Sequence, residues 1–423
     1  MADIPITKPC FDANDRRAVL EPLDSGWVVQ GPRVAAFENA IARFTGARCA
    51  VATTSCTTAL HLALLACGIG PGDEVIVPAF TFVATANVVE HTGARPVFAD
   101  IDLDTFNIDV TRIERVVTRK TKAIMPVHLF GLTADMDGVM RIARGGRLHA
   151  EQSRDRRNQC RDREGAVESS LSRRPLRVIE DAACAIGAFF RGRHAGTFGD
   201  AGCLSFHPRK SITTGEGGMV LTNKAAVAGA VRKLRDHGAE ITDLARHKTG
   251  GLLLPEYNAA GYNYRMTDIQ GALGCAQAAK LNWILKRKRA LARRYENALG
   301  DLQEFRLPGT PAHCVHGYQS YVLLALPRQM TLPDRRELRL LHARRNGLMK
   351  SLAAHGIATR QGTHAVHCLA YYRSRYGLRP EDYPNALAAD RLSLALPLYP
   401  QMTIAEQDRV IRALRECVDT SPP

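Results

Sequence analysis

The sequence predicts an α/β fold, with a large domain built on a mostly parallel central sheet and a smaller α/β domain at the C-terminus. Over the first 225 residues, short apolar segments alternate with segments of helical periodicity. One long helical pattern follows at 266–299, and after it a strand pattern is flanked by helical patterns. Strand–helix–strand alternation is typical of parallel strands, so we expect helices on both faces of the sheet.

The strands of the large domain are short apolar segments bounded by turn residues. We predict them at 49–52, 74–78, 96–100, 123–128, 177–181, 201–206 and 219–222. Helices are predicted where apolar residues recur three and four positions apart, at 57–67, 83–92 and 134–143. The C-terminal domain should hold a strand at 318–326 and helices at 338–354 and 404–416. The predicted units are a large domain at 1–265, a connecting helix at 266–312 and a small domain at 313–423.

The segment at about 145–172 does not follow this pattern, because it is polar, rich in arginine and without usable periodicity. Its flanks would join naturally if it were removed. A surface insertion is the favoured interpretation, and a misread stretch of coding sequence is the alternative that the sequence leaves open. A loop entering a strand lies opposite the carboxyl ends of a parallel sheet, where sites form, so the insertion should be tolerated.

Composition excludes several classes of protein. The chain is 45% hydrophobic and 23% charged, as globular proteins are. No apolar run is long enough for a membrane span, and residues 1–8 lack the apolar core of a signal peptide. Eleven cysteines without C-x-x-C spacing suggest neither a metal site nor a disulfide framework, so we expect a cytoplasmic protein. The net charge of +15 lies largely on predicted helices, which favours an anionic small substrate over nucleic acid.

Three neighbouring motifs indicate the chemistry. Glu-Asp-Ala-Ala at 180–183 ends an apolar strand, Ser-Phe-His-Pro-Arg-Lys at 205–210 ends the next, and Gly-Glu-Gly-Gly follows at 215–218. Pyridoxal phosphate chemistry needs an amine that forms a Schiff base and a carboxylate that keeps the pyridine nitrogen protonated. Lys210 and Asp181 supply these two groups, whereas a lone lysine near glycines would usually be a solvated surface residue.

The stretch 178–223 resembles the DegT/StrS-type aminotransferases, and the resemblance extends over nearly the whole chain outside the insertion. It implies the pyridoxal-phosphate-dependent transferase fold of type I, and a homodimer with active sites at the subunit boundary. Lys210 then matches the Schiff-base lysine, and Asp181 matches the carboxylate that pairs with the pyridinium nitrogen. Because relatives that act as dehydratases carry histidine in place of this lysine, Lys210 favours aminotransfer.

The same resemblance implies a binding site for the cofactor phosphate. Ser55, Cys56 and Thr57 match a phosphate cradle at a helix N-terminus, where free backbone N–H groups suit a dianion. By itself this segment could equally be an ordinary helix cap. Ser205 resembles a further phosphate ligand, and Asn263 matches a residue that reaches the phosphate from the partner subunit.

Other positions are implied with open alternatives. Phe82 matches an aromatic residue that stacks on the cofactor ring, and a core phenylalanine is the alternative. Cys184 stands where relatives place a contact to the phenolic oxygen, although a thiol there could simply pack. His128, His364 and His367 match stretches near the mouth of the site, where they could contact the substrate or be structural.

The function implied by the resemblance is transfer of an amino group, from glutamate, to a keto-sugar attached to a nucleotide, in polysaccharide or amino-sugar biosynthesis. The partners would be small-molecule substrates and a second copy of the chain, with no membrane and no nucleic acid. A keto-cyclitol such as scyllo-inosose is the alternative acceptor. A pyridoxal-phosphate-binding regulator without turnover is another alternative, which the presence of both Lys210 and Asp181 disfavours.

Overall fold

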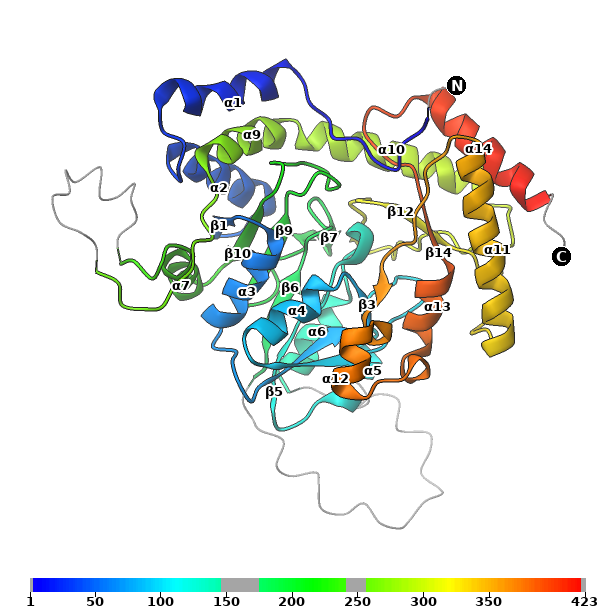
Figure 1. The fold of residues 1–423 in the computed structure, drawn as a ribbon, viewed down its shortest axis with the longest axis horizontal. Helices are drawn as coiled ribbons and strands as arrows, with labels where there is room; N and C mark the ends of the chain where they lie inside the picture. The colour runs from blue at the N-terminus through cyan, green and yellow to red at the C-terminus, as the bar shows by residue number, and fades with distance from the viewer. Residues whose placement is uncertain (1–2, 146–174, 241–255, 420–423) are drawn as a thin grey trace, which may run out of the picture.

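A computed structural model describes residues 3–145, 175–240 and 256–419 of the chain (Figure 1). Its central sheet has seven strands in the order β1-β10-β9-β6-β5-β2-β4. They are β1 (Cys49–Thr53), β2 (Glu74–Pro78), β4 (Arg95–Ala99), β5 (Thr121–Ile124), β6 (Arg177–Asp181), β9 (Ala201–Ser205) and β10 (Gly218–Thr222). From β9 to β4 all neighbours are parallel, while β10 is antiparallel to β1 and β9. The predicted mostly parallel sheet is confirmed.

The predicted strands all occur, and β2 and β6 have the predicted bounds. The strand predicted at 123–128 is shorter, because β5 ends at Ile124. Pro126 has no N–H to continue the ladder, although its carbonyl still accepts a hydrogen bond from the backbone of Asp181 at 2.9 Å. Beyond it, Val127 forms only an isolated bridge with Asp181.

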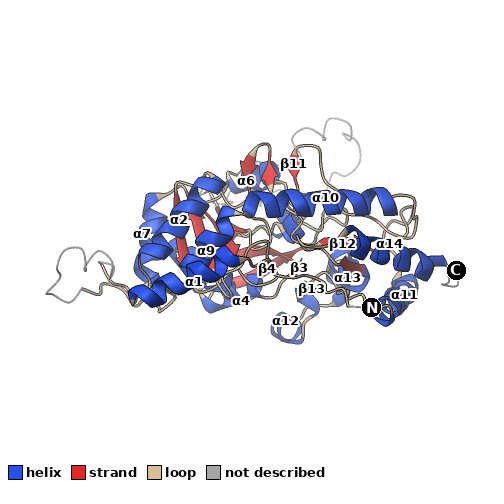
Figure 2. Ribbon diagram, turned by 90° about the horizontal axis from the view of Figure 1, so that it is seen from above, coloured by secondary structure: helices blue, strands red, loops and turns tan. Residues whose placement is uncertain are grey.

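Helices cover both faces of the sheet, as Figure 2 shows. In β1, Val51 packs in one hydrophobic cluster, and its neighbours Ala50 and Ala52 pack in another. Alternate residues of a strand point to opposite faces, so these clusters lie on opposite sides of the sheet. The first cluster includes α3 (Cys56–Ala66), α4 (Ala84–His91) and α7 (Ala225–Arg235); α2 (Pro32–Thr45) and α6 (Met136–Ala143) pack on the other side.

The prediction of a single helix at 266–299 is wrong in one respect, because the helix is interrupted. α9 (Asp268–Ala279) and α10 (Leu281–Leu299) are separated by Lys280, whose φ of −104° and ψ of 6° are not helical. The ammonium group of Lys280 forms ion pairs with Asp12 at 2.9 Å and with Asp15, at the start of α1 (Ala13–Ser25). These ion pairs anchor the junction to α1, and α9 packs against α1 and α2 (Figure 1).

The C-terminal elements surround a hydrophobic cluster of their own. Its centre is a two-stranded antiparallel sheet of β12 (Tyr321–Leu324) and β14 (Ser393–Leu396). α11 (Arg335–Ala354) and α14 (Ile404–Asp419) contribute to this cluster, and α13 (Pro384–Leu392) packs against α11 and β14. The N-terminal segment joins it, since Ile4 forms a backbone bridge with Ile357. The domain boundaries at 265 and 312 stay predictions.

Shorter elements complete the described chain. They are α5 (Val110–Val116), α12 (Ala370–Tyr376), β3 (Phe80–Thr81), β13 (His364–Ala365), β7 (Phe189–Phe190), β8 (Arg193–His194) and β11 (Cys314–Val315). Short 3-10 turns also occur, among them η1 (Leu129–Gly131) and η4 (Val366–Cys368). None of the helices in residues 3–145, 175–240 and 256–419 has the length and apolar character needed to span a membrane.

The predicted insertion at 145–172 lies, apart from Gly145, outside the described residues. The chain on its two sides is held together, because the backbone N–H of Leu176 donates to the carbonyl of Ala143 at 2.8 Å. Leu176 immediately precedes β6, whose other end carries Asp181. The segment therefore departs from and returns to the amino edge of the sheet, away from the end where Asp181 lies.

Deleting 145–172 should leave cofactor binding and activity within a few-fold of wild type. Joining Arg144 to Arg173 leaves a short connection between Ala143 and Leu176, whose backbones are already hydrogen-bonded. The measurements are the absorbance of bound cofactor, the rate of amino transfer and the melting temperature. A folded deletion variant that no longer binds the cofactor would show that the segment contributes to the site.

Candidate active site

Asp181 is a buried carboxylate at the carboxyl end of β6, with 5% of its surface exposed. Its Oδ1 accepts a hydrogen bond from the backbone of Ala183 at 3.1 Å, and Oδ2 accepts one from the hydroxyl of Thr85 at 2.7 Å. Within the described chain, no lysine, arginine or histidine lies within ion-pair distance of it. Since a buried charge needs a partner, two neutral donors leave this carboxylate suited to a cationic ligand group.

Thr85 is a candidate site residue that the sequence analysis missed. It lies in α4, and its backbone N–H donates to the carbonyl of Phe82 at 3.1 Å, so the two residues are one turn apart. The available signal was its place three residues after the aromatic residue predicted to stack on the cofactor. Phe82 itself is 62% exposed, which leaves its ring accessible to a flat partner close to Asp181.

Lys210 lies in the turn after β9, where its backbone N–H donates to the carbonyl of His207 at 2.8 Å. Its Nζ is 3.1 Å from the sulfur of Cys184, so the two predicted cofactor contacts are neighbours. Burial by itself would lower the pKa of Lys210, but Cys184, Cys56 and Asp181 raise it, and the net shift is upward. The amine therefore holds its proton firmly, although it must lose that proton to attack an aldehyde.

Three strands bring the predicted phosphate ligands together. Gly218 at the start of β10 is opposite Thr53 of β1 on one side and opposite Ser205 of β9 on the other. A Cβ atom at Gly218 would lie 2.2 Å from the carbonyl oxygen of Ser55, so only glycine permits this approach. The register thus places Ser205 and the turn containing Ser55 on either side of Gly218.

The turn after β1 is also the N-terminus of α3. Ser55 caps the helix, because its hydroxyl accepts a hydrogen bond from the backbone of Thr58 at 3.1 Å. The N–H groups of Cys56 and Thr57 belong to the first turn, which has no acceptors within the helix, and they suit an anion. The thiol of Cys56 points away, toward the carbonyl of Cys203 at 3.6 Å, and burial raises its pKa well above the usual value. Only the backbone of Cys56 can bind phosphate.

Asn263 lies in a segment that is attached to its own chain. The carbonyl of Tyr264 accepts a hydrogen bond from the backbone of Thr54 at 3.0 Å, and Asn263 forms a backbone bridge with Asp236. Arg265 pairs with the carboxylate of Asp236 at 2.5 Å, which stabilises the loop. The side chain of Asn263 is exposed, so it is free to contact a partner subunit, and its role at the phosphate stays a prediction.

His128 is fully buried, and its two ring nitrogens are bonded within the protein. Nε2 faces the Glu180 carboxylate at 2.9 Å, and Nδ1 accepts a hydrogen bond from the backbone of Ala134 at 3.1 Å. Glu180 also accepts hydrogen bonds from three backbone N–H groups, those of Gly196, Phe198 and Gly199. No ring nitrogen of His128 is left for a substrate, so the geometry favours the structural alternative.

The other two histidines differ from each other. His367 is fully buried, its Nε2 lies 3.1 Å from the carbonyl of Pro380, and burial lowers its pKa. His364 is exposed on β13 and pairs with Thr81 of β3, next to Phe82. We therefore keep a substrate contact as a prediction for His364 and favour a structural role for His367.

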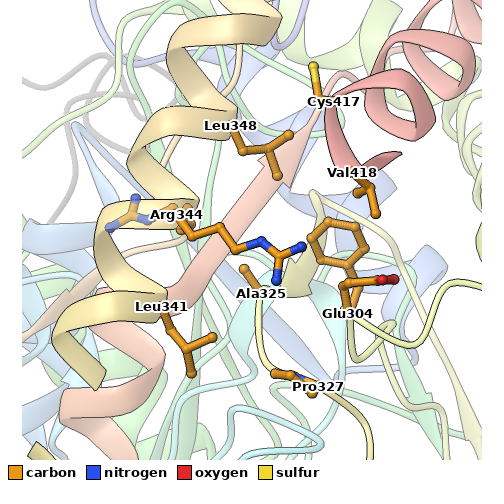
Figure 3. A pocket seen from close by; sticks show the side chains of 10 residues that line it. Glu304, Ala325, Pro327, Leu341, Arg344, Leu348, Cys417 and Val418 are labelled. Carbon is orange, nitrogen blue, oxygen red and sulfur yellow. The ribbon is translucent and has the colours of Figure 1, made fainter. Parts of the chain in front are cut away.

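The pocket in Figure 3 is separate from these residues. It is lined by Glu304, Phe305, Ala325, Pro327, Leu341, Arg344, Arg345, Leu348, Cys417 and Val418. Its walls come from α11, from the end of α14 and from the segments around β12. Since neither Lys210 nor Asp181 contributes to it, this hollow belongs to the C-terminal elements and is separate from the candidate active site.

The sequence model of the DegT/DnrJ/EryC1/StrS aminotransferase family matches residues 9–149 and 165–415. The chain belongs to this family. It is 36% identical over 415 residues to the spore coat polysaccharide biosynthesis protein SpsC of Bacillus subtilis, covering 98% of this chain and 97% of that protein. The unmatched residues 150–164 fall within the predicted insertion.

Similar solved structures agree with this family assignment. The PMP-form of Spr1654 from Streptococcus pneumoniae, described as a putative sugar aminotransferase, has a TM-score of 0.83 and 27% identity over 99% of both chains. DesV of S. venezuelae has a TM-score of 0.81 and 29% identity over 100% of both chains. The predicted fold type I, the cofactor and the enzyme class are confirmed: this family member is a pyridoxal-phosphate-dependent aminotransferase.

The residues present fit the cofactor. Asp181 has only neutral protein donors in the described chain, Gly218 lets the turn at Ser55 approach β10 closely, and Phe82 exposes its ring. When bound, pyridoxal phosphate supplies an aldehyde and a ring that accepts electrons. Lys210 would provide the amine, and Asp181 would hold a proton on the ring nitrogen.

Proposed function

We propose that this aminotransferase transfers an amino group from glutamate to a keto-sugar attached to a nucleotide. The observation that carries the proposal is a pair of arginines beside the reactive lysine. Arg209 precedes Lys210 in the chain, and its carbonyl accepts a hydrogen bond from the side chain of Gln319 at 2.9 Å. Arg360 is the charged neighbour that, together with burial, lowers the pKa of Arg209.

No carboxylate neutralises this cation pair within residues 3–145, 175–240 and 256–419. Arg209 and Arg360 are both exposed, and within the described residues neither has a carboxylate in ion-pair distance. The backbone of Arg360 is held by Ala395 of β14, whose N–H donates to its carbonyl at 2.7 Å. Two guanidinium groups suit the bidentate binding of carboxylate or phosphate. A dicarboxylate donor and a diphosphate-linked acceptor both offer such groups.

The same pair favours a nucleotide-linked acceptor over a keto-cyclitol. A keto-cyclitol such as scyllo-inosose carries no anionic group, so it would leave both guanidinium groups without a partner. The names of relatives support a sugar acceptor as well, since SpsC is named for spore coat polysaccharide biosynthesis and Spr1654 for sugar amination. A regulator without turnover is disfavoured by the complete set of Lys210, Asp181 and the phosphate cradle.

Assays with glutamate against keto-sugar nucleotides and inososes test the proposal. We expect turnover with a nucleotide-linked acceptor, and Arg360→Met should raise its KM at least about tenfold, the loss of one charge-assisted contact. Arg339→Met, which changes an exposed arginine of α11, is the matched control and should have no effect. Preference for an inosose, or an unchanged KM in Arg360→Met, would contradict the nucleotide-linked acceptor.

Two further parts of the proposal concern the protein as a whole. We propose a homodimer in which Asn263 completes the partner's phosphate site; its exposed side chain on an anchored loop supports this arrangement. We also propose a cytoplasmic location. All cysteines in the described ranges are free thiols, as is usual in a reducing compartment.

A further inference from the structure

Lys288 is a buried lysine that none of the predicted roles uses. It lies in the middle of α10 and has 2% of its surface exposed. Lysines are seldom buried without a carboxylate partner, because desolvation of an ammonium group is costly. Within the described part of the chain, no carboxylate lies within ion-pair distance of Lys288. Its position therefore needs another explanation.

The contacts of Lys288 lead to the segment that carries Lys210. Its Nζ donates to the carbonyl of Gln319 at 2.9 Å and makes a long contact of 3.5 Å with the hydroxyl of Ser211. The side chain of Gln319 in turn donates to the carbonyl of Arg209 at 2.9 Å. Arg209 and Ser211 are the residues on either side of Lys210, so this network holds Lys288 against the segment that carries Lys210.

The titratable groups that face Lys288 come from three other segments of the chain. Burial lowers the pKa of Lys288 to about 7; Cys184, on the segment after β6, opposes this shift, and Lys210 adds to it. From the segment before β12, His316 also faces it, and burial together with Arg289 and Lys288 lowers the pKa of His316 to about 3. The cation that acts on Lys288 is thus Lys210, whereas Arg289 acts on His316.

We propose that Lys288 is a positioning residue that acts on the reaction through Lys210: its ammonium group, held behind the Lys210 segment by Gln319 and Ser211, favours loss of the proton from the Lys210 amine. Like charges repel, so each protonated amine makes it easier for the other to lose its proton. Lys210 needs this help because Cys184 and Asp181 otherwise stabilise its protonated form.

The sign of the effect follows from the state of Lys288. Below about pH 7 Lys288 is protonated, and its charge favours a neutral Lys210. As the pH rises through 7, Lys288 loses its own proton and the help disappears. The contribution of Lys288 is therefore present in weakly acidic solution and absent above about pH 8.5, whereas a merely structural role would be independent of pH.

The test measures how fast the apo-enzyme captures pyridoxal phosphate. The rate is read from the increase in the absorbance of bound cofactor, and it is determined at several pH values between 6 and 9. At pH 6, Lys288→Met should capture the cofactor about threefold to tenfold more slowly than wild type. This is the effect of raising the pKa of the Lys210 amine by about half to one unit. Above pH 8.5 the two rates should converge. Lys288→Gln keeps a hydrogen-bond donor without the charge and should behave in the same way.

Two controls separate the alternatives. Lys288→Arg keeps a permanent charge and should match wild type at pH 6, and Lys286→Met changes an exposed lysine of the same helix and should have no effect. Repeating the measurement with pyridoxal, which lacks the phosphate, should give the same deficit. A deficit that is equal at every pH, or that vanishes with pyridoxal, overturns the proposal. The proposal is also overturned if a folded Lys288→Met or Lys288→Gln variant shows the same pH dependence of the capture rate as wild type.

The proposal rests on the aminotransferase chemistry and not on the identity of the acceptor. Because the test uses no amino donor and no sugar, its failure would leave the nucleotide-linked acceptor untouched. Conversely, an enzyme that prefers another acceptor could still show the predicted dependence on Lys288.

Discussion

Lys210→Ala should lower the rate of amino transfer by at least about a thousandfold, the range expected when a nucleophile and proton carrier is removed. We expect the amine of Lys210 to bond to the cofactor aldehyde, and its only close polar neighbour among the described side chains is the thiol of Cys184 at 3.1 Å. That thiol cannot replace it. We therefore also expect loss of the absorbance of the lysine-bound cofactor, measured by spectrophotometry on the purified protein.

The matched control is Lys286→Ala, which removes an exposed lysine from α10 and should leave rate and absorbance unchanged. The melting temperature of both variants should stay near that of wild type in the absence of cofactor. Near-normal transamination by Lys210→Ala would mean that another amine performs the reaction, and the buried Lys288 would then be the first residue to examine.

The second large effect is the recovery of activity when two inactive variants are mixed. If Asn263 serves the phosphate bound by the partner subunit, Asn263→Asp should weaken cofactor binding there, since it sets a carboxylate against a phosphate dianion. Lys210→Ala should be inactive in its own chain. A mixed dimer then has one site with both defects and one site with an intact Lys210 and an intact partner Asn263.

Refolding the two variants together should restore about a quarter of the wild-type activity, because half of randomly paired dimers are mixed and each has one sound site. The assay uses a cofactor concentration that saturates wild type but not Asn263→Asp. Each variant refolded alone is the control. The segment around Asn263 is attached to its own chain through Thr54, so service of the same chain's phosphate is a real competing arrangement. If mixed dimers are confirmed by mass but no activity is recovered, the result would favour an Asn263 that serves the phosphate of its own chain.

Local patterns in the sequence carried most of the fold. The seven strands of the sheet were predictable because each is a short apolar segment between turn residues, and such segments are buried on both faces in a parallel sheet. The interruption at Lys280 was not predictable. The apolar periodicity continues through it, and the carboxylates that hold Lys280 lie more than 260 positions away, at Asp12 and Asp15.

For the candidate site, the sequence indicated the chemistry, and the tertiary structure determined which side chains surround Lys210 and Asp181. The predictions for Lys210 and Asp181 came from motifs, because amine and carboxylate are required by the cofactor whatever surrounds them. Thr85 and Lys288 were not predicted, since the contacts of each lie far away in the sequence: Thr85 donates to Asp181, and Lys288 donates to Gln319 and contacts Ser211. His128 shows the converse, because a histidine next to a site looks functional until Glu180 and Ala134 are found to occupy both of its nitrogens. Side-chain partners across the fold depend on packing, and packing is the one property that a chain read residue by residue does not contain.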